Sequence, residues 1–158
     1  LELGTGSGAI ALAVARHRRD VRITATDVSP AALTIARRNG TKLGLDIVWF
    51  CGNWYDAVSG RFDLIVSNPP YVSNDDSHLS TLVGEPRIAL AAGLEGLDAL
   101  RIVVNGAPGR LSPGGWLLVE HGHAQGSAVR DLFDAARFAS TRTVRDLAGH
   151  ERVTLGQQ

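Results

Sequence analysis

The chain has 158 residues, of which 44% are hydrophobic and 20% are charged, and its 16 basic residues balance its 16 acidic ones. This length suits one domain with its own core, and the apolar content excludes a disordered tail. The lone Cys51 excludes an internal disulfide and a cysteine-built zinc site, and no apolar stretch is long enough to cross a membrane. A net charge of zero argues against stable binding of long nucleic acid.

The N-terminal half alternates apolar runs with helical patterns. Ser29 and Pro30 are typical of a helix start, and Gly44 is typical of a helix end. The sequence therefore predicts helices at 9–17 and 30–43 and strands at 1–3, 21–27, 46–51 and 62–67, the first of them truncated. The chain contains no Met and opens directly in an apolar segment, so we expect it to be a fragment of a longer protein.

The C-terminal half continues the alternation after a segment, 72–93, that has no clear period. A loop of this length favours a lid or substrate loop. We expect helices at 97–107 and 127–137, a turn at 112–115, a strand at 116–120 and an antiparallel pair at 141–146 and 152–155. These elements predict a Rossmann-like α/β domain. Its seven-stranded, mostly parallel sheet has an antiparallel C-terminal pair and helices on both faces.

A glycine-rich turn, Gly4-Thr5-Gly6-Ser7-Gly8, follows the first strand. Ligands of open parallel sheets bind at the carboxyl ends of the strands, where glycines let the backbone approach closely. Asp27 lies at the end of the second strand, where a carboxylate can accept hydrogen bonds from ribose hydroxyls. This pattern is compatible with a nicotinamide cofactor or with S-adenosylmethionine (SAM). Glu2, just before the turn, favours SAM, because a carboxylate attracts the ammonium of SAM and repels a pyrophosphate.

The fourth strand runs into Asn68-Pro69-Pro70-Tyr71, which decides between the two cofactors. The two prolines stiffen the segment. The Asn68 side-chain oxygen and a proline carbonyl can then accept both hydrogens of a planar NH₂ group. These acceptors orient a poor nitrogen nucleophile toward a methyl donor and stabilise the positive charge that develops on it. Tyr71 is expected to stack on the substrate or to lie near the sulfonium. We therefore assign catalysis to Asn68, Pro69 and Tyr71, and substrate binding to these residues and Pro70.

The sequence resembles the HemK/PrmC family of class I SAM-dependent methyltransferases, the peptide chain release factor N5-glutamine methyltransferases. The resemblance covers nearly the whole chain. It includes the turn, the Asn-Pro-Pro-Tyr motif, and the strings Glu85-Pro86-Arg87, Glu120-His121-Gly122 with Gln125-Gly126, and 145–149.

The resemblance implies SAM as the cofactor and the glutamine of the Gly-Gly-Gln loop of class 1 release factors as the substrate. It implies that residues 1–158 are a methyltransferase domain without the family's N-terminal helical domain. It further implies a cytoplasmic protein, which we expect to be a monomer. Trp54 matches a position near the adenine, and Asn53 stands where the family usually has Asp. The residues expected to hold SAM are Glu2, Gly4, Thr5, Gly6, Ser7, Gly8, Asp27, Asn53, Trp54 and Asn68.

Other functions remain open at this point. An amino methyltransferase acting on adenine N6 or guanine N2 of nucleic acid would use the same chemistry, because both targets are planar amines. A non-catalytic cofactor-binding module and a Rossmann oxidoreductase are further alternatives. His121 and His123 are too few to form a metal site, so we expect no metal. We expect Cys51 to be a small core residue, Asp75 and Asp76 to be a solvated lid tip, and Glu85 to order the lid.

Overall fold

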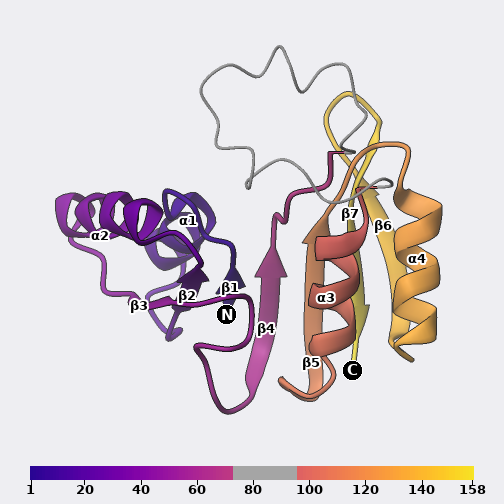
Figure 1. The fold of residues 1–158 in the computed structure, drawn as a ribbon, viewed down its shortest axis with the longest axis horizontal. Helices are drawn as coiled ribbons and strands as arrows, with labels where there is room; N and C mark the ends of the chain where they lie inside the picture. Colours follow the sequence, from indigo (N-terminus) through magenta and orange to yellow (C-terminus); the bar gives the residue numbers. More distant parts are fainter. Residues whose placement is uncertain (73–95) are drawn as a thin grey trace.

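A seven-stranded sheet organises the part of the chain that the computed structural model describes, residues 1–72 and 96–158 (Figure 1). The strand order is β3-β2-β1-β4-β5-β7-β6. The first five strands are parallel, and β7 runs antiparallel to both β5 and β6. The predicted fold class is therefore confirmed. The strands are β1 (Glu2–Leu3), β2 (Thr24–Asp27), β3 (Val48–Cys51), β4 (Phe62–Ser67), β5 (Leu111–Glu120), β6 (Ala139–Arg145) and β7 (Glu151–Gln157).

Within residues 1–72 and 96–158, four helices cover the two faces of the sheet: α1 (Ala9–His17), α2 (Pro30–Leu43), α3 (Asp98–Gly106) and α4 (Gly126–Ala135). Helix α2 has the predicted ends, because the Ser29 hydroxyl accepts a hydrogen bond from the Ala32 N–H and Gly44 adopts a φ of 63°. On the face of α1 and α2, Trp49 of β3 packs beside Gly8 and Gly40. The register places Gly156 of β7 on the opposite face, where it contacts Phe133 of α4.

The core is divided between the two halves of the sheet. The larger cluster lies around β4, β5, α3 and α4 and includes Ile65, Leu117 and Phe133, all fully buried. The smaller cluster lies under α1 and is formed by Ala11, Leu12, Ala15, Ala25 and Ile47. Leu3 of β1 belongs to the larger cluster.

Two expectations about the strands are wrong. The predicted turn at 112–115 lies inside β5, where the pairing with β4 shifts between Phe62 and Leu64. Such an irregularity accommodates Pro113 and the positive φ of Gly114, which normal strand geometry would not. Cys51 is exposed rather than buried, because it lies on β3, the edge strand of the sheet.

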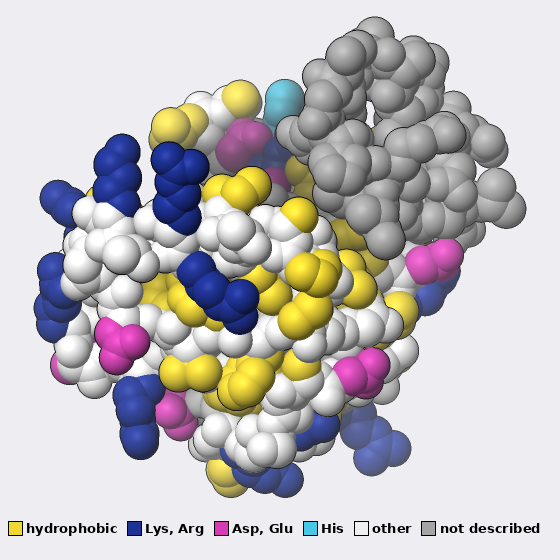
Figure 2. Space-filling view, turned by 60° about the vertical axis from the view of Figure 1, so that its left-hand side comes forward, with side chains coloured by type: hydrophobic (Ala, Val, Ile, Leu, Met, Phe, Trp, Pro, Cys, Tyr) yellow, Lys and Arg dark blue, Asp and Glu magenta, His cyan; other side chains and the backbone are white. Residues whose placement is uncertain are grey.

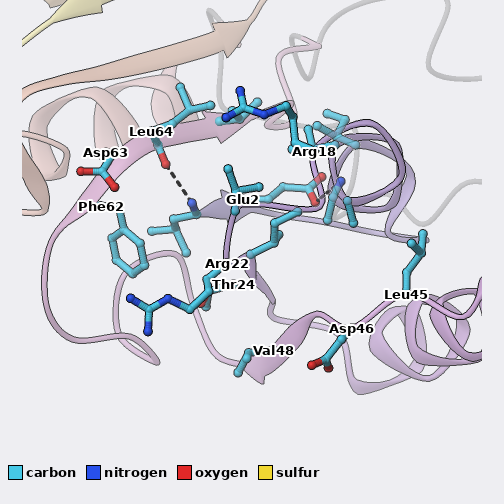
Figure 3. A pocket seen from close by; sticks show the side chains of 18 of the residues that line it. Glu2, Arg18, Arg22, Thr24, Leu45, Asp46, Val48, Phe62, Asp63 and Leu64 are labelled. Carbon is cyan, nitrogen blue, oxygen red and sulfur yellow. Dashed lines mark hydrogen bonds between the residues drawn. The ribbon is translucent and has the colours of Figure 1, made fainter.

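Strand β1 is much shorter than its neighbours, and a groove extends the line of β1 between β2 and β4 (Figure 3). The Leu1 backbone nitrogen donates a hydrogen bond to the Leu64 carbonyl oxygen over 2.8 Å. Leu64 and Val48, both in the lining, remain exposed. Figure 2 shows hydrophobic side chains at the surface among Lys and Arg side chains on the face that it presents.

Candidate functional site

The carboxyl ends of three adjacent strands bring the predicted site residues into one row. Leu3 of β1 is paired with Thr26 of β2 on one side and with Ser67 of β4 on the other. The Ser67 hydroxyl also donates a hydrogen bond to the Leu3 carbonyl oxygen, at 2.9 Å. The residues that follow these three in the sequence are Gly4, Asp27 and Asn68. The register therefore places the glycine-rich turn between the predicted ribose ligand and the predicted amide ligand.

The glycine-rich turn needs its glycines for two different reasons. Gly4, Gly6 and Gly8 have φ values of 68°, 56° and 85°, in the left-handed region that side chains disfavour. A Cβ on Gly6 would meet no atom within 4 Å, so the backbone there faces open space. A Cβ on Gly8 would lie 3.0 Å from Trp49 Cη2, so this glycine also permits close packing of α1 on the sheet. An open backbone at Gly6 fits the approach of a ligand.

Glu2 supports the turn from within the protein. Its side chain is buried, and its Oε2 atom accepts hydrogen bonds from the Thr5 hydroxyl at 2.6 Å and from the Ala11 N–H at 3.0 Å. Burial raises the pKa of Glu2, and these two donors partly oppose the shift. The carboxylate thus joins the turn to the first residues of α1. The sequence predicts that this carboxylate faces a ligand ammonium, whereas its partners in the structure are Thr5 and Ala11.

Asp27 holds the other side of the turn. Its Oδ2 atom accepts from the Gly6 N–H and its Oδ1 atom accepts from the Ser29 N–H, both at 2.8 Å. Each carboxylate oxygen has a second lone pair, so the side chain can still accept hydrogen bonds from ribose hydroxyls. Asp27 therefore orders the turn and keeps the capacity predicted for it.

Trp54 lies beside the first glycine of the turn. Its Cζ3 atom is 3.6 Å from the position that a Cβ on Gly4 would occupy. Its backbone has a φ of 47°, which is strained for a tryptophan, and its carbonyl oxygen accepts a hydrogen bond from the Thr26 hydroxyl. Strained backbone of this kind is found at ligand sites. Asn53, which precedes Trp54, is exposed.

The Asn68–Tyr71 segment leaves β4 at the same edge of the sheet. Asn68 is exposed, Pro69 is buried and Pro70 is partly buried. Tyr71 packs its ring against the larger core cluster and donates its hydroxyl to Glu120 Oε1 at 3.1 Å. Residues 68–71 thus form a corner in which the amide of Asn68 is exposed and the other three side chains are buried or partly buried. Asp75, Asp76, Glu85 and nearly all of the expected lid lie outside the described residues.

Comparison with known proteins identifies the family. Residues 1–105, well over half of the chain, match the family described as methyltransferase small domain. The chain belongs to this methyltransferase family. The predicted recognition of a methyltransferase is therefore confirmed.

Curated relatives match along nearly the whole of this methyltransferase domain. Release factor glutamine methyltransferases from Xylella fastidiosa (strain Temecula1) and Yersinia pestis are 54% and 48% identical to it over 160 residues, or 99% of the chain. The domain spans 58% of the length of each of these relatives.

Solved methyltransferases share the fold of the domain. The methyltransferase from Pyrococcus furiosus gives a TM-score of 0.74 at 21% identity, covering 99% of this chain and 73% of that one. A 16S rRNA N2 G1207 methyltransferase from Thermus thermophilus, solved with AdoMet and guanosine, gives 0.72 at 22% identity, covering 99% and 36%. The family and the fold agree with SAM as the cofactor.

Two polar residues of the methyltransferase domain were not predicted as site residues. Glu120 ends β5 and Gln125 immediately precedes α4, and both contact Tyr71. The sequence contains a signal for Glu120, because a carboxylate at the end of an apolar parallel strand must lie at the ligand edge of the sheet. No comparable signal identifies Gln125, whose contact with the Tyr71 carbonyl oxygen joins residues 54 positions apart.

Two further observations concern metal sites and membrane-spanning helices. Among residues 1–72 and 96–158, no group of His, Cys, Asp and Glu side chains has the arrangement of a metal site. Within the same ranges, every helix is too short or too polar to cross a membrane.

Proposed function

We propose that this chain is the methyltransferase domain of a longer enzyme. The enzyme transfers a methyl group from SAM to the side-chain amide nitrogen, N5, of the glutamine in the Gly-Gly-Gln motif of class 1 release factors. The observation that carries the proposal is the register of β1 and β4, which sets the Asn68 corner beside the glycine-rich turn. The release factor glutamine methyltransferases that match along 99% of the chain support this substrate.

The turn and its neighbours fit SAM. The open backbone at Gly6 gives access, Asp27 keeps lone pairs for the ribose, and Trp54 supplies an aromatic surface beside Gly4. When bound, SAM supplies a methyl group on a positively charged sulfur. The residues proposed to hold it are Gly4, Thr5, Gly6, Ser7, Gly8, Asp27, Asn53, Trp54 and Asn68, with Glu2 beneath the turn.

The Asn68 corner acts on the glutamine amide. The Asn68 side-chain oxygen and the Pro69 carbonyl oxygen each accept a hydrogen bond from one N–H group of the amide, and together they fix the plane of the amide. An amide nitrogen is a poor nucleophile because its lone pair is delocalised. Fixed acceptors would stabilise the positive charge that develops on nitrogen as the new N–C bond forms and the bond between the methyl carbon and sulfur breaks. The products would be a neutral thioether and an amide nitrogen that has lost one proton to solvent. Orientation of the amide lowers the remaining barrier.

The proposed substrate also defines the setting in which the enzyme works. Release factors act on the ribosome, so we place the enzyme in the cytoplasm. We propose that the release factor is a transient partner of a monomeric enzyme and that nucleic acid is not a stable ligand, since the chain has no net charge.

Mass spectrometry of a release factor provides the test. Full-length enzyme that contains this chain is incubated with release factor and SAM, and we expect the mass of one methyl group on the Gly-Gly-Gln peptide. A release factor whose Gly-Gly-Gln glutamine is replaced by Ala serves as the control. Parallel reactions contain tritium-labelled SAM with RNA or DNA. An unmodified glutamine contradicts the proposal, and label on nucleic acid instead supports the alternative amine substrate.

A further inference from the structure

Tyr71 is held at both of its polar ends, by the last residue of β5 and by the residue that precedes α4. Its hydroxyl donates to Glu120 Oε1 at 3.1 Å, and its carbonyl oxygen accepts from Gln125 Nε2 at 3.0 Å. Between these two ends, the ring packs against the larger core cluster. A side chain with these partners is suited to fixing the chain rather than to moving with a substrate.

The Gln125 side chain is itself fixed by backbone groups. Its Oε1 atom accepts from the Gly122 N–H at 2.8 Å, which orients the amide so that Nε2 points at the Tyr71 carbonyl oxygen. Nε2 also lies 3.4 Å from the Gly96 carbonyl oxygen. Gly96 has a φ of 69°, and a Cβ there would overlap the Tyr71 carbonyl oxygen. Gln125 therefore joins three segments at the Tyr71 backbone.

Glu120 lies at the same carboxyl edge of the sheet as Asn68, where it can hold the corner. Ser67 of β4 is paired with Val119 of β5, so Asn68 and Glu120 follow paired residues on adjacent parallel strands. The bond from Tyr71 to Glu120 closes a loop in which only Pro69 and Pro70 separate Asn68 from Tyr71. Because both prolines have a fixed φ, the segment between Tyr71 and Asn68 has few torsions that could absorb a displacement of Tyr71.

We propose that Tyr71 anchors the corner through its hydroxyl and carbonyl groups, and that Glu120 and Gln125 are the positioning residues that hold it. This proposal rests on the proposed function, because it assigns these residues a task in amide binding by Asn68 and Pro69. It replaces the expectation that the Tyr71 ring stacks on the substrate.

Replacement of single atoms separates the anchor from the stacking role. Tyr71→Phe keeps the ring and removes the hydroxyl, so a stacking role predicts unchanged turnover. An anchoring role predicts that kcat falls, by up to about a hundredfold if the corner shifts by about 1 Å. Glu120→Ala should reproduce this loss, whereas Glu120→Gln keeps an oxygen acceptor and should restore most of kcat. Gln125→Glu keeps the size of the side chain and removes its N–H donors, so it should also lower kcat.

The measurements are kcat and KM for methyl transfer to release factor, the Kd of SAM, and the unfolding temperature of each variant. Asp131→Ala, which removes an exposed carboxylate on α4, is the matched control and should match the wild type. We expect kcat to fall while the Kd of SAM stays near the wild-type value. The kcat of the double variant Tyr71→Phe/Glu120→Ala should be no lower than that of the less active single variant, because the two groups form one interaction.

Wild-type turnover in Tyr71→Phe, or equal losses in Glu120→Gln and Glu120→Ala, would overturn the anchor. If a variant at 71 or 120 is unfolded at the assay temperature, unchanged turnover in Gln125→Glu would overturn it and a loss with unchanged SAM affinity would support it. A wild-type enzyme that leaves release factor unmodified instead overturns the proposed function. If that enzyme labels RNA, the same series is measured on RNA, since the corner would hold that amine in the same way.

Discussion

The Nε2 atom of His121, the residue after β5, lies 2.9 Å from the hydroxyl oxygen of Thr154 on β7, and both residues are fully buried. The Thr154 hydroxyl is 2.9 Å from that of Thr143, which accepts a hydrogen bond from Arg130. Because arginine only donates, the simplest direction of this chain runs from Arg130 through both threonines to His121. The imidazole then accepts at Nε2 and donates from Nδ1 to the Gly122 carbonyl oxygen, so the network fits a neutral ring.

This arrangement predicts how stability depends on pH. Burial lowers the pKa of His121 below its usual 6.5, and nearby Arg130 adds to the shift. The unfolded chain therefore binds a proton at a higher pH than the folded chain does. The contribution of this residue to stability is complete above pH 6.5 and is lost as the pH falls below that value.

A His121→Gln variant tests this dependence, since glutamine can still accept from Thr154 and does not titrate. We expect its free energy of unfolding, measured by urea titration, to fall less steeply than that of the wild type as the pH is lowered from 6.5. His17, exposed at the end of α1, provides the matched control His17→Gln. Equal slopes for all three proteins would contradict the prediction.

The Asn68 amide is expected to matter for turnover rather than for folding, because it is exposed. Asn68→Ala should lower kcat by about a hundredfold or more, the usual effect of removing one group that stabilises transition-state charge. Because Asn68 is also a predicted SAM ligand, we expect the Kd of SAM to rise by a much smaller factor. Asn105→Ala, an exposed position on α3, is the control. Methylation kinetics with calorimetric SAM binding separate the two effects, and an unchanged kcat would remove Asn68 from the site.

Two glycines with nearly the same φ separate backbone strain from close packing. Gly8→Ala and Gly60→Ala both force alanine to a φ near 85–88°, which costs about 1–2 kcal/mol. Gly60 has no atom within 4 Å of the added Cβ, whereas at Gly8 the new methyl lies 3.0 Å from Trp49 Cη2. We expect Gly8→Ala to lose about 1–3 kcal/mol more than Gly60→Ala. Only Gly8→Ala should weaken SAM binding. Urea unfolding and calorimetry measure both, and equal losses would show that packing at Gly8 is unimportant.

Glu2 distinguishes support of the turn from contact with the ligand. Glu2→Gln keeps an oxygen for Thr5 and Ala11 and removes the charge, so the supporting role predicts an almost unchanged Kd for SAM. The raised pKa of Glu2 means that the wild type loses stability as the pH rises above 4.5, where the unfolded carboxyl ionises first. The variant should lack this loss. A large rise in its Kd for SAM would instead restore the predicted contact with the ammonium.

Most of the fold follows from local patterns in the sequence. Helix α1 and strand β4 have the predicted bounds, and α2 has the predicted cap and end, because apolar periodicity and capping residues act locally. The turn expected at 112–115 is instead part of β5, because pairing with β4 overrides the turn preference of Pro113 and Gly114. The exposure of Cys51 depends on the strand order, which no local pattern gives.

The candidate site was predictable to a similar extent. The glycine-rich turn, Asp27 and Asn68 follow apolar strands, and parallel strands bring their ends to one edge. The partners of Glu2 are close in the sequence, but they reach its carboxylate only because the glycine-rich turn folds back over it. The two contacts of Tyr71 join residues 49 and 54 positions apart, so they arise only when the sheet has assembled. Periodicity predicts neither set of contacts.

The two paired residues of β1 connect halves of the molecule that have separate cores. The turn and Asp27 lie in one half and the Asn68 corner lies in the other, so the donor and acceptor groups of the proposed reaction would meet at β1. Because Leu3 is paired with strands of both halves, the alignment of the two reactants depends on the backbone pairing at the carboxyl end of β1.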